Sequence, residues 1–243
     1  LPMPASIERT LPNGLHVVVV PNTELPYVTV LCGLKYGAWA EDAALPGTAS
    51  AASALLTKGT EKYSAEQLAE LIEFNALTIE GSATLDVSQV VATALSDKLP
   101  LAVELLSEVI RRPAFPEKEI ELLKHQRSVS LSVNEEDASY IVDRALRRTL
   151  YGAHPYARSV DGELADVPNL NRAGIAKFWA TYARPDTMTV YFAGDVTPEK
   201  AIALAEQYFG DWSVEGKVPD VAIAEIPKSA GTRIVLVDKP GAV

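Results

Sequence analysis

The sequence predicts a layered domain of the α+β class rather than a regular doubly wound sheet. The chain opens with two runs of β-type residues, 7–11 and 15–20, which the turn residues Pro-Asn-Gly at 12–14 separate. Two more strand-like runs follow one another near 77–85 and 88–95. Segments with helical spacing of apolar residues interrupt these strands irregularly, in the order β, α, β, α, α, β, α. Such an order favours helices packed on a sheet over repeated βαβ units.

Local patterns define the elements up to the middle of the chain. Residues 27–34 predict a third strand, because β-branched residues are common there. Residues 47–56 are small and apolar all round, which predicts a closely packed, buried helix. Ser64 and Gln67 form the residue pair of a capping box, which opens a helix reaching about Phe74.

The following part of the chain is predicted to be mainly helical. An amphipathic helix over 99–111 stops before Pro113, since proline cannot continue it. Phe115 and Pro116 then open one long helical stretch, because apolar residues recur near helical spacing as far as Leu150. The last elements are a helix at 174–182, a strand at 188–192 and a helix at 199–209.

A change of composition after Trp212 predicts the domain boundaries. The segment that follows contains prolines and little periodicity, which is typical of a linker. We therefore expect one domain at 1–212, a linker at 213–231 and, at 232–243, the first strand of a second, truncated domain.

Charge and cysteine content exclude several classes of function. The net charge is −10 with acidic residues spread along the chain, which disfavours nucleic acids and anionic membrane surfaces as partners. No apolar run approaches the ~18 residues of a membrane span. Cys32 is the only cysteine, so no intrachain disulfide can form. The compartment stays open between bacterial periplasm and cytoplasm.

Eight different short motifs follow one another along the chain. They are Leu-Pro-Asn-Gly-Leu-His at 11–16, Gly-Ala-Trp-Ala-Glu-Asp at 37–42, Pro-Gly at 46–47, the segment 58–68, Arg-Pro-Ala-Phe-Pro at 112–116, Tyr-Gly-Ala-His-Pro-Tyr at 151–156, Arg-Pro at 184–185 and Gly-Asp at 194–195. Together they resemble the M16 family of insulinase-, pitrilysin- and mitochondrial-processing-peptidase-like zinc metallopeptidases. The end of the chain, 235–243, resembles the start of the second domain of an M16B-type subunit. The resemblance implies an M16 metalloprotease-like (LuxS/MPP-like) domain with a mostly antiparallel sheet packed against helices, followed by a linker and the start of a second M16-type domain.

The resemblance also locates the catalytic positions of the family. Active members carry an inverted zinc motif, H-x-x-E-H, on the helix between Pro46-Gly47 and the segment 58–68. Two histidines four residues apart share one helix face and bind zinc, and the glutamate activates the metal-bound water. Here Ser50 and Ala54 stand at the histidine positions and Ser53 at the position of the base. Counting back from the acidic run at 135–137 places the third ligand, a glutamate in active members, at Ser130.

A strand that presents substrate in active members carries a G-G-x-x-N-A pattern. The corresponding residues here are Ala-Leu-Thr-Ile-Glu-Gly at 76–81, so Glu80 replaces the asparagine. Glu80, Gly81 and Ser82 are therefore the candidate substrate contacts.

These replacements predict a chain with no catalytic residues and no metal ligands of its own. The resemblance implies a non-catalytic subunit or half of an M16 zinc protease, which forms part of a peptide-binding chamber beside an active H-x-x-E-H subunit or domain. Zinc is expected in the active partner only. Unfolded or extended peptides are the expected ligands, and a hetero- or homodimer is the expected assembly. Two alternatives stay open: an active zinc endopeptidase with displaced ligands, and a structural scaffold similar to respiratory-complex core subunits.

Other candidate groups have simpler explanations. His16, His125 and His154 lie far apart in sequence and form no pair at i, i+4. We expect His125 on the solvated face of its helix and His154 in a hydrogen bond with backbone. No G-x-S-x-G motif surrounds Ser50 or Ser53, so neither is expected to be a serine nucleophile.

Overall fold

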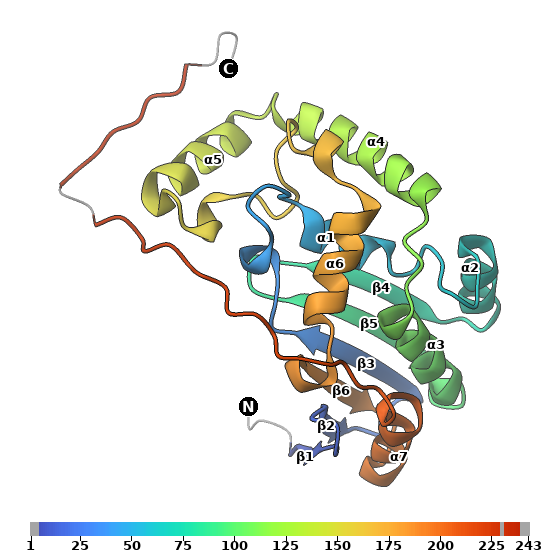
Figure 1. Ribbon diagram of the computed structural model, residues 1–243. Helices are drawn as coiled ribbons and strands as arrows, with labels where there is room; N and C mark the ends of the chain where they lie inside the picture. The colour runs from blue at the N-terminus through green and yellow to red at the C-terminus, as the bar shows by residue number, and fades with distance from the viewer. Residues whose placement is uncertain (1–4, 229–230, 239–243) are drawn as a thin grey trace.

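A computed structural model describes residues 5–228 and 231–238 of the chain. Its centre is one six-stranded sheet with the strand order β1-β2-β6-β3-β5-β4 (Figure 1). The strands are β1 (Ile7–Thr10), β2 (His16–Pro21), β3 (Tyr27–Leu34), β4 (Thr78–Ala83), β5 (Ser88–Leu95) and β6 (Met188–Gly194). All neighbouring strands are antiparallel except β2 and β6, which are parallel. The predicted α+β class with a mostly antiparallel sheet is confirmed.

Seven α-helices accompany the sheet within the described residues. They are α1 (Thr48–Leu55), α2 (Ala65–Phe74), α3 (Leu99–Arg111), α4 (Glu117–Asn134), α5 (Ala138–Tyr151), α6 (Arg172–Tyr182) and α7 (Pro198–Phe209). Four short 3-10 helices, η1 (Ala38–Ala40), η2 (Pro155–Ala157), η3 (Val167–Asn169) and η4 (Pro185–Thr187), lie in the connections. The predicted capping box is confirmed, because the Ser64 hydroxyl accepts from Gln67 N and the Gln67 side chain accepts from Ser64 N.

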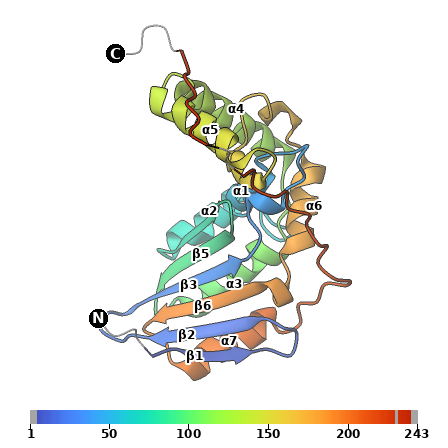
Figure 2. The same cartoon turned by 90° about the vertical axis from the view of Figure 1, so that its left-hand side faces the viewer.

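Helices cover one face of the sheet and leave the other open. Helix α3 packs on β5 and α7 packs on β2, behind the sheet in the view of Figure 2. Burial alternates along β3 and β5, so every second side chain points into this helix-covered core. Val28, Val30 and Cys32 are among these buried side chains. Burying each such aliphatic side chain stabilises the fold by ~1.5–3 kcal/mol.

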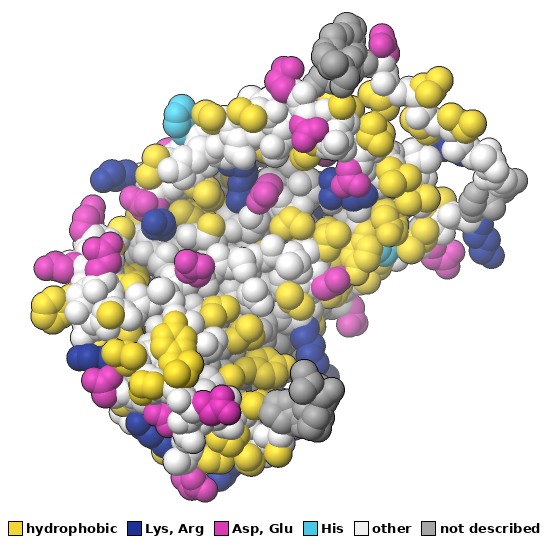
Figure 3. Space-filling view, turned by 180° about the vertical axis from the view of Figure 1, so that it is seen from behind, with side chains coloured by type: hydrophobic (Ala, Val, Ile, Leu, Met, Phe, Trp, Pro, Cys, Tyr) yellow, Lys and Arg dark blue, Asp and Glu magenta, His cyan; other side chains and the backbone are white. Residues whose placement is uncertain are grey.

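The open face carries the alternate residues of the same strands. Val18, Leu31 and Val91 are half-buried there, and Tyr191 is 43% exposed. Figure 3, seen from behind relative to Figure 1, shows hydrophobic side chains over this region mixed with white and charged ones. Polar side chains lie between these apolar ones, because Thr29, Gln89 and Thr93 share the same face.

The predicted single helical stretch over 115–150 is wrong. Helix α4 ends at Asn134 and α5 begins at Ala138. Asp137 stands between them and caps α5, because its carboxylate accepts a hydrogen bond of 2.8 Å from Ser139 N. Aspartate side chains compete with the helical backbone for such bonds, so the chain turns where the acidic run lies.

The segment after Trp212 packs against the domain at its start. Val214, Val218 and Val221 pack against the core. The buried guanidinium of Arg184 donates hydrogen bonds of 2.7–3.2 Å to the three successive carbonyls of residues 214–216. The strand predicted at 232–237 is not formed, since the described residues 231–238 contain no strand. The rest of the predicted second-domain segment, 239–243, lies outside the described residues.

Candidate functional site

The helix on which the resemblance places Ser50, Ser53 and Ala54, α1, lies between α6 and the edge strand β4 (Figure 1). Its small residues permit this close packing, because Ala49, Ala51 and Ala52 are fully buried. Gly81 of β4 contributes as well: a Cβ atom there would lie 2.1 Å from the carbonyl oxygen of Ser53. The absence of a side chain at Gly81 therefore lets the edge strand reach the α1 backbone.

A buried carboxylate caps the N-terminus of α1. Gly47, the N-cap residue, has φ = 87°, a conformation that favours glycine. Glu41 is only 7% exposed, and its two carboxylate oxygens accept hydrogen bonds from Gly47 N at 3.0 Å and Ala49 N at 2.6 Å. Burial raises the pKa of Glu41 to about 7, although these N–H groups and the nearby Arg158 and Arg127 favour its charged form.

Ser50 lies in a polar network at the meeting point of α1 and α4. Its hydroxyl donates to Asp161 Oδ1 at 2.5 Å and accepts from Arg127 Nη2 at 2.9 Å. Arg127 is 8% exposed, and its Nη1 also donates to Gly47 O at 3.0 Å. Burial lowers the pKa of Arg127, whereas Asp161 and Glu41 raise it. The side chain that faces Ser50 is thus a buried cation.

The other positions predicted from the resemblance, Ser53, Ala54 and Ser130, offer no imidazole, thiolate or carboxylate. Ser53 is fully buried, and its hydroxyl has no hydrogen-bond partner among the described residues. Ala54 presents only a methyl group. Ser130 is exposed on α4, about one helical turn beyond Arg127. The structure therefore brings Arg127 into contact with Ser50, and it shows no hydrogen bond between Ser130 and α1 within the described residues.

Arg127 was not singled out by the sequence, although a signal for it exists. The apolar residues Ile120 and Leu131 of α4 are buried, and Arg127 lies on the same helix face. A basic residue on an otherwise apolar stripe needs a buried partner. The identity of that partner is not visible locally, because Ser50 lies 77 residues away in sequence.

These groups do not fit a zinc ion. Protein zinc sites use imidazole nitrogen, thiolate sulfur or carboxylate oxygen. The four predicted positions supply two hydroxyls and one methyl group on α1 and one hydroxyl on α4, with a guanidinium close by. In the part of the chain that the structure describes, no three His, Cys, Asp or Glu side chains are grouped so that they could hold a metal ion.

The three histidines lie in separate places. The Nδ1 atom of His154 accepts from Tyr156 N at 3.1 Å, which confirms the predicted backbone bond. His125 is exposed on α4, as expected. His16 lies on β2, where its Nδ1 atom is 3.2 Å from Thr10 Oγ1. None of them approaches Ser50 or Ser53 through a hydrogen bond in the described chain, so neither serine has an imidazole base.

The candidate substrate contacts lie on β4, which pairs with β5 alone and forms one edge of the sheet. Glu80 and Ser82 have exposed side chains, and Gly81 is half-buried against α1. A sheet edge presents unpaired backbone N–H and C=O groups to which an extended peptide can add as a strand.

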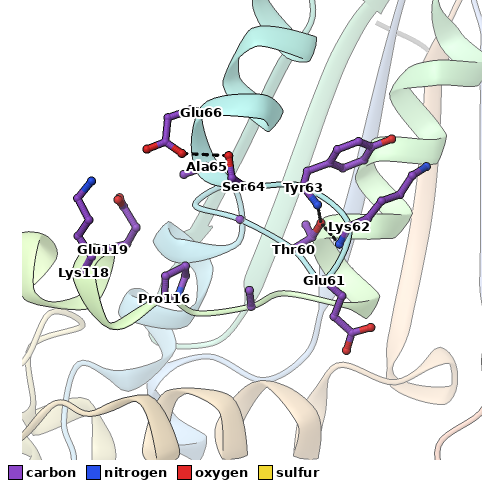
Figure 4. Close-up of a pocket in the computed structure, with 12 residues that line it drawn as sticks. Thr60, Glu61, Lys62, Tyr63, Ser64, Ala65, Glu66, Pro116, Lys118 and Glu119 are labelled. Atoms are coloured by element: carbon purple, nitrogen blue, oxygen red, sulfur yellow. Dashed lines mark hydrogen bonds between the residues drawn. The ribbon is translucent and has the colours of Figure 1, made fainter.

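A separate hollow of about 300 Å³ lies between the start of α2 and the start of α4 (Figure 4). Several of its polar groups form hydrogen bonds with one another. The Ser64 hydroxyl donates to Glu66 at 3.0 Å, and the Thr60 hydroxyl accepts from the backbone of Lys62 and Tyr63. These bonds complete the local turn and helix cap.

No helix in residues 5–228 or 231–238 is both long and apolar enough to cross a membrane.

Comparison with known families identifies two matches. The family described as insulinase (peptidase family M16) matches residues 17–163, more than half of the chain. The family described as the peptidase M16 inactive domain matches residues 169–242.

Several curated proteins are similar over most of this chain. A probable mitochondrial-processing peptidase subunit beta of Schizosaccharomyces pombe is 28% identical over 211 residues, which cover 86% of this chain and 46% of that protein. An uncharacterized zinc protease of Mycobacterium tuberculosis is 27% identical, with coverage of 86% and 48%. The human cytochrome b-c1 complex subunit 1 is 26% identical, with coverage of 86% and 43%. The chain thus spans about half the length of these relatives.

Solved structures share the fold. A protease from Helicobacter pylori has a TM-score of 0.84 at 22% identity, covering 91% of this chain and 54% of that one. A peptidase M16 inactive domain from Pseudomonas fluorescens has a TM-score of 0.80 at 24% identity, covering 90% and 54%. The first half of the periplasmic protease PqqL from Escherichia coli has a TM-score of 0.81 at 18% identity, covering 92% and 50%.

Proposed function

Because the chain belongs to the insulinase family of peptidases, family M16, we propose that it is a non-catalytic subunit or half of an M16 zinc protease. An active partner with an H-x-x-E-H motif supplies the zinc ion and the general base. This chain supplies part of the wall of the chamber in which an extended peptide is held. The family membership itself confirms what the order of the sequence motifs predicted.

The observation that carries the proposal is the chemistry of the α1 face. Ser50, Ser53 and Ala54 offer neither imidazole nor carboxylate, and the guanidinium of Arg127 lies 2.9 Å from the Ser50 hydroxyl. Water activation in a zinc peptidase needs a metal and a base with an accessible lone pair. A protonated guanidinium supplies neither, so we assign no catalytic step to this face.

The peptide-binding role is supported by the sheet. β4 offers a free edge beside α1, and its Glu80 and Ser82 side chains are exposed. The open face next to it carries apolar side chains among polar ones, with Leu31 and Val91 half-buried and Tyr191 43% exposed. Backbone bonding at an edge combined with apolar side-chain contacts binds extended peptides of many sequences. We therefore propose an unfolded or extended peptide as the ligand.

The need for a partner domain is supported by helix α5. It has no buried residue, and Val142, Leu146 and Leu150, spaced four apart, are 58%, 51% and 50% exposed. Such a stripe gains stability only when another surface covers it. The chain also spans about half the length of the three curated relatives described above, and two of those three are named as subunits.

We propose the same domain layout that the sequence predicts. An M16-type domain occupies 1–212, a linker occupies 213–231, and a second M16-type domain begins at 232–243. The match of residues 169–242 to the M16 inactive domain supports continuation of the family pattern through the linker. Active and inactive domains would then pair as a hetero- or homodimer.

A structural scaffold without any part in proteolysis is the second candidate. The similarity to the human cytochrome b-c1 complex subunit 1 favours it. Identification of the partner separates the two functions. The tag-bearing chain is expected to co-purify from its source cells with an H-x-x-E-H protein, and the complex is expected to cleave fluorescein-labelled casein in a chelator-sensitive way.

The purified chain alone is the control and is expected to leave casein intact with or without added zinc. Chelator-sensitive cleavage by the chain alone would overturn the proposal in favour of a zinc endopeptidase with displaced ligands. A stable complex with respiratory subunits and no H-x-x-E-H protein would overturn it in favour of the scaffold.

A further inference from the structure

The Arg127 side chain connects three parts of the chain that are distant in sequence. The residue belongs to α4, and its guanidinium donates to Gly47 O at the start of α1 and to the Ser50 hydroxyl within α1. It also lies 3.5 Å from both the backbone oxygen and Oδ1 of Asp161, in the loop after η2. Few side chains other than arginine can reach so many acceptors at once, because the guanidinium presents five N–H donors in a fixed plane.

The position of this cation is informative. Ser50 stands where active relatives place the first histidine of H-x-x-E-H, and Nη2 of Arg127 lies 2.9 Å from its hydroxyl oxygen. An imidazole at position 50 is several atoms larger than a hydroxyl, so it would meet the guanidinium. The Arg127 side chain is only 7% exposed and cannot swing freely into water to make room.

We propose that the Arg127 guanidinium is a protein-borne cation that joins α1, α4 and the Asp161 loop in place of a bound metal ion. This inference rests on the proposed non-catalytic role and adds to it a reason why the site stays free of zinc. The contacts among α1, α4 and the Asp161 loop need no metal ion, because Arg127 supplies the positive charge and is covalently part of α4. Arg127 also opposes metal uptake, because a divalent cation a few ångströms away would face a fixed like charge.

Coulomb's law gives the size of the repulsion between a divalent ion and the Arg127 guanidinium. A divalent ion and a guanidinium about 6 Å apart, at an effective dielectric constant of about 20, repel strongly enough to weaken binding by more than about 100-fold. Replacing Ser50, Ser53, Ala54 and Ser130 with the family ligands is therefore not sufficient to restore a zinc site. The guanidinium must be removed as well.

Two variants of the whole chain test this. The first carries Ser50→His, Ser53→Glu, Ala54→His and Ser130→Glu with Arg127 kept, and the second adds Arg127→Met. Zinc affinity, measured by calorimetric titration after circular dichroism has verified folding, is expected to be at least about 100-fold higher in the second variant. Equal affinities in the two variants, whether both bind zinc or neither does, would overturn the inference.

A single substitution keeps the inference testable if the multiple variants fail to fold. Arg127→Met in the otherwise unchanged chain is expected to lower the thermal unfolding midpoint, whereas EDTA is expected to leave the midpoint of the unchanged chain where it is. Arg127→Lys is expected to restore only part of the loss, because a single ammonium cannot span the same acceptors. An unchanged midpoint for Arg127→Met would refute this inference alone, whereas zinc bound by the unchanged chain would refute the proposed function.

Discussion

The buried carboxylate of Glu41 makes the stability of the domain depend on pH in an unusual direction. Burial raises the pKa of Glu41 from 4.5 to about 7 in the folded chain. Between these two values the unfolded chain releases the proton while the folded chain keeps it. The unfolded state therefore binds fewer protons, and the free energy of unfolding falls as pH rises through this window.

The pKa shift of Glu41 sets how much the free energy of unfolding changes with pH. A difference of about 2.5 pKa units corresponds to about 3.4 kcal/mol, and about 2.5 kcal/mol of this is lost between pH 5 and pH 8. For a chain of this length a change of that size moves the thermal midpoint by ~5–10 °C. Other carboxylates add their own pH dependence, so Glu41 must be isolated by comparison with a variant that does not titrate.

Urea unfolding of the unchanged chain and of Glu41→Gln, from pH 5 to pH 8, isolates this contribution. Glutamine keeps an acceptor for one of the two α1 N–H groups but carries no charge at any of these pH values. The stability of the unchanged chain relative to Glu41→Gln is expected to fall by about 2.5 kcal/mol as pH rises from 5 to 8. A relative stability that is constant over this range, or that increases with pH, would refute the assignment of a raised pKa to Glu41.

Three further substitutions test the packing, the linker and the partner surface. Gly81→Ala is expected to destabilise the domain by ~1–3 kcal/mol or more in urea unfolding, because the added Cβ would lie 2.1 Å from Ser53 O. An unchanged unfolding midpoint would contradict the close approach of β4 to α1. Arg184→Leu removes the hydrogen bonds that hold the carbonyls of 214–216, so limited proteolysis is expected to cut this segment faster, and an unchanged cleavage rate would show that the guanidinium does not hold it. Leu146→Asp, at a side chain 51% exposed, is expected to change the stability of the isolated chain by less than ~0.5 kcal/mol but to weaken co-purification of the partner; retention of the full partner yield would exclude α5 from the interface.

Much of the fold was predictable because it depends on local patterns. The hairpin with its Pro-Asn-Gly turn, the capping box at Ser64 and the alternating strand β5 each carry their signal within a few residues. The break between α4 and α5 was missed, since apolar spacing continued across it. There the capping bond from Asp137 outweighed the helical periodicity.

The site was predictable only in part. The resemblance of the motifs placed Ser50, Ser53 and Ala54 on one helix, and the structure places all three on α1. The cation beside them could not be found in the same way, because Arg127 meets Ser50 across 77 residues and Asp161 across 34. Contacts of this kind depend on how α4 crosses α1, which no local pattern specifies.

The most direct test of the non-catalytic role is the metal content of the protein. Tag-free chain is incubated with zinc, desalted and analysed by inductively coupled plasma mass spectrometry. Because the α1 face offers hydroxyls, a methyl group and a guanidinium instead of zinc ligands, less than about a tenth of an equivalent of zinc is expected. Close to one equivalent of zinc, removed by a chelator, would contradict the non-catalytic role and would point to displaced ligands elsewhere in the chain.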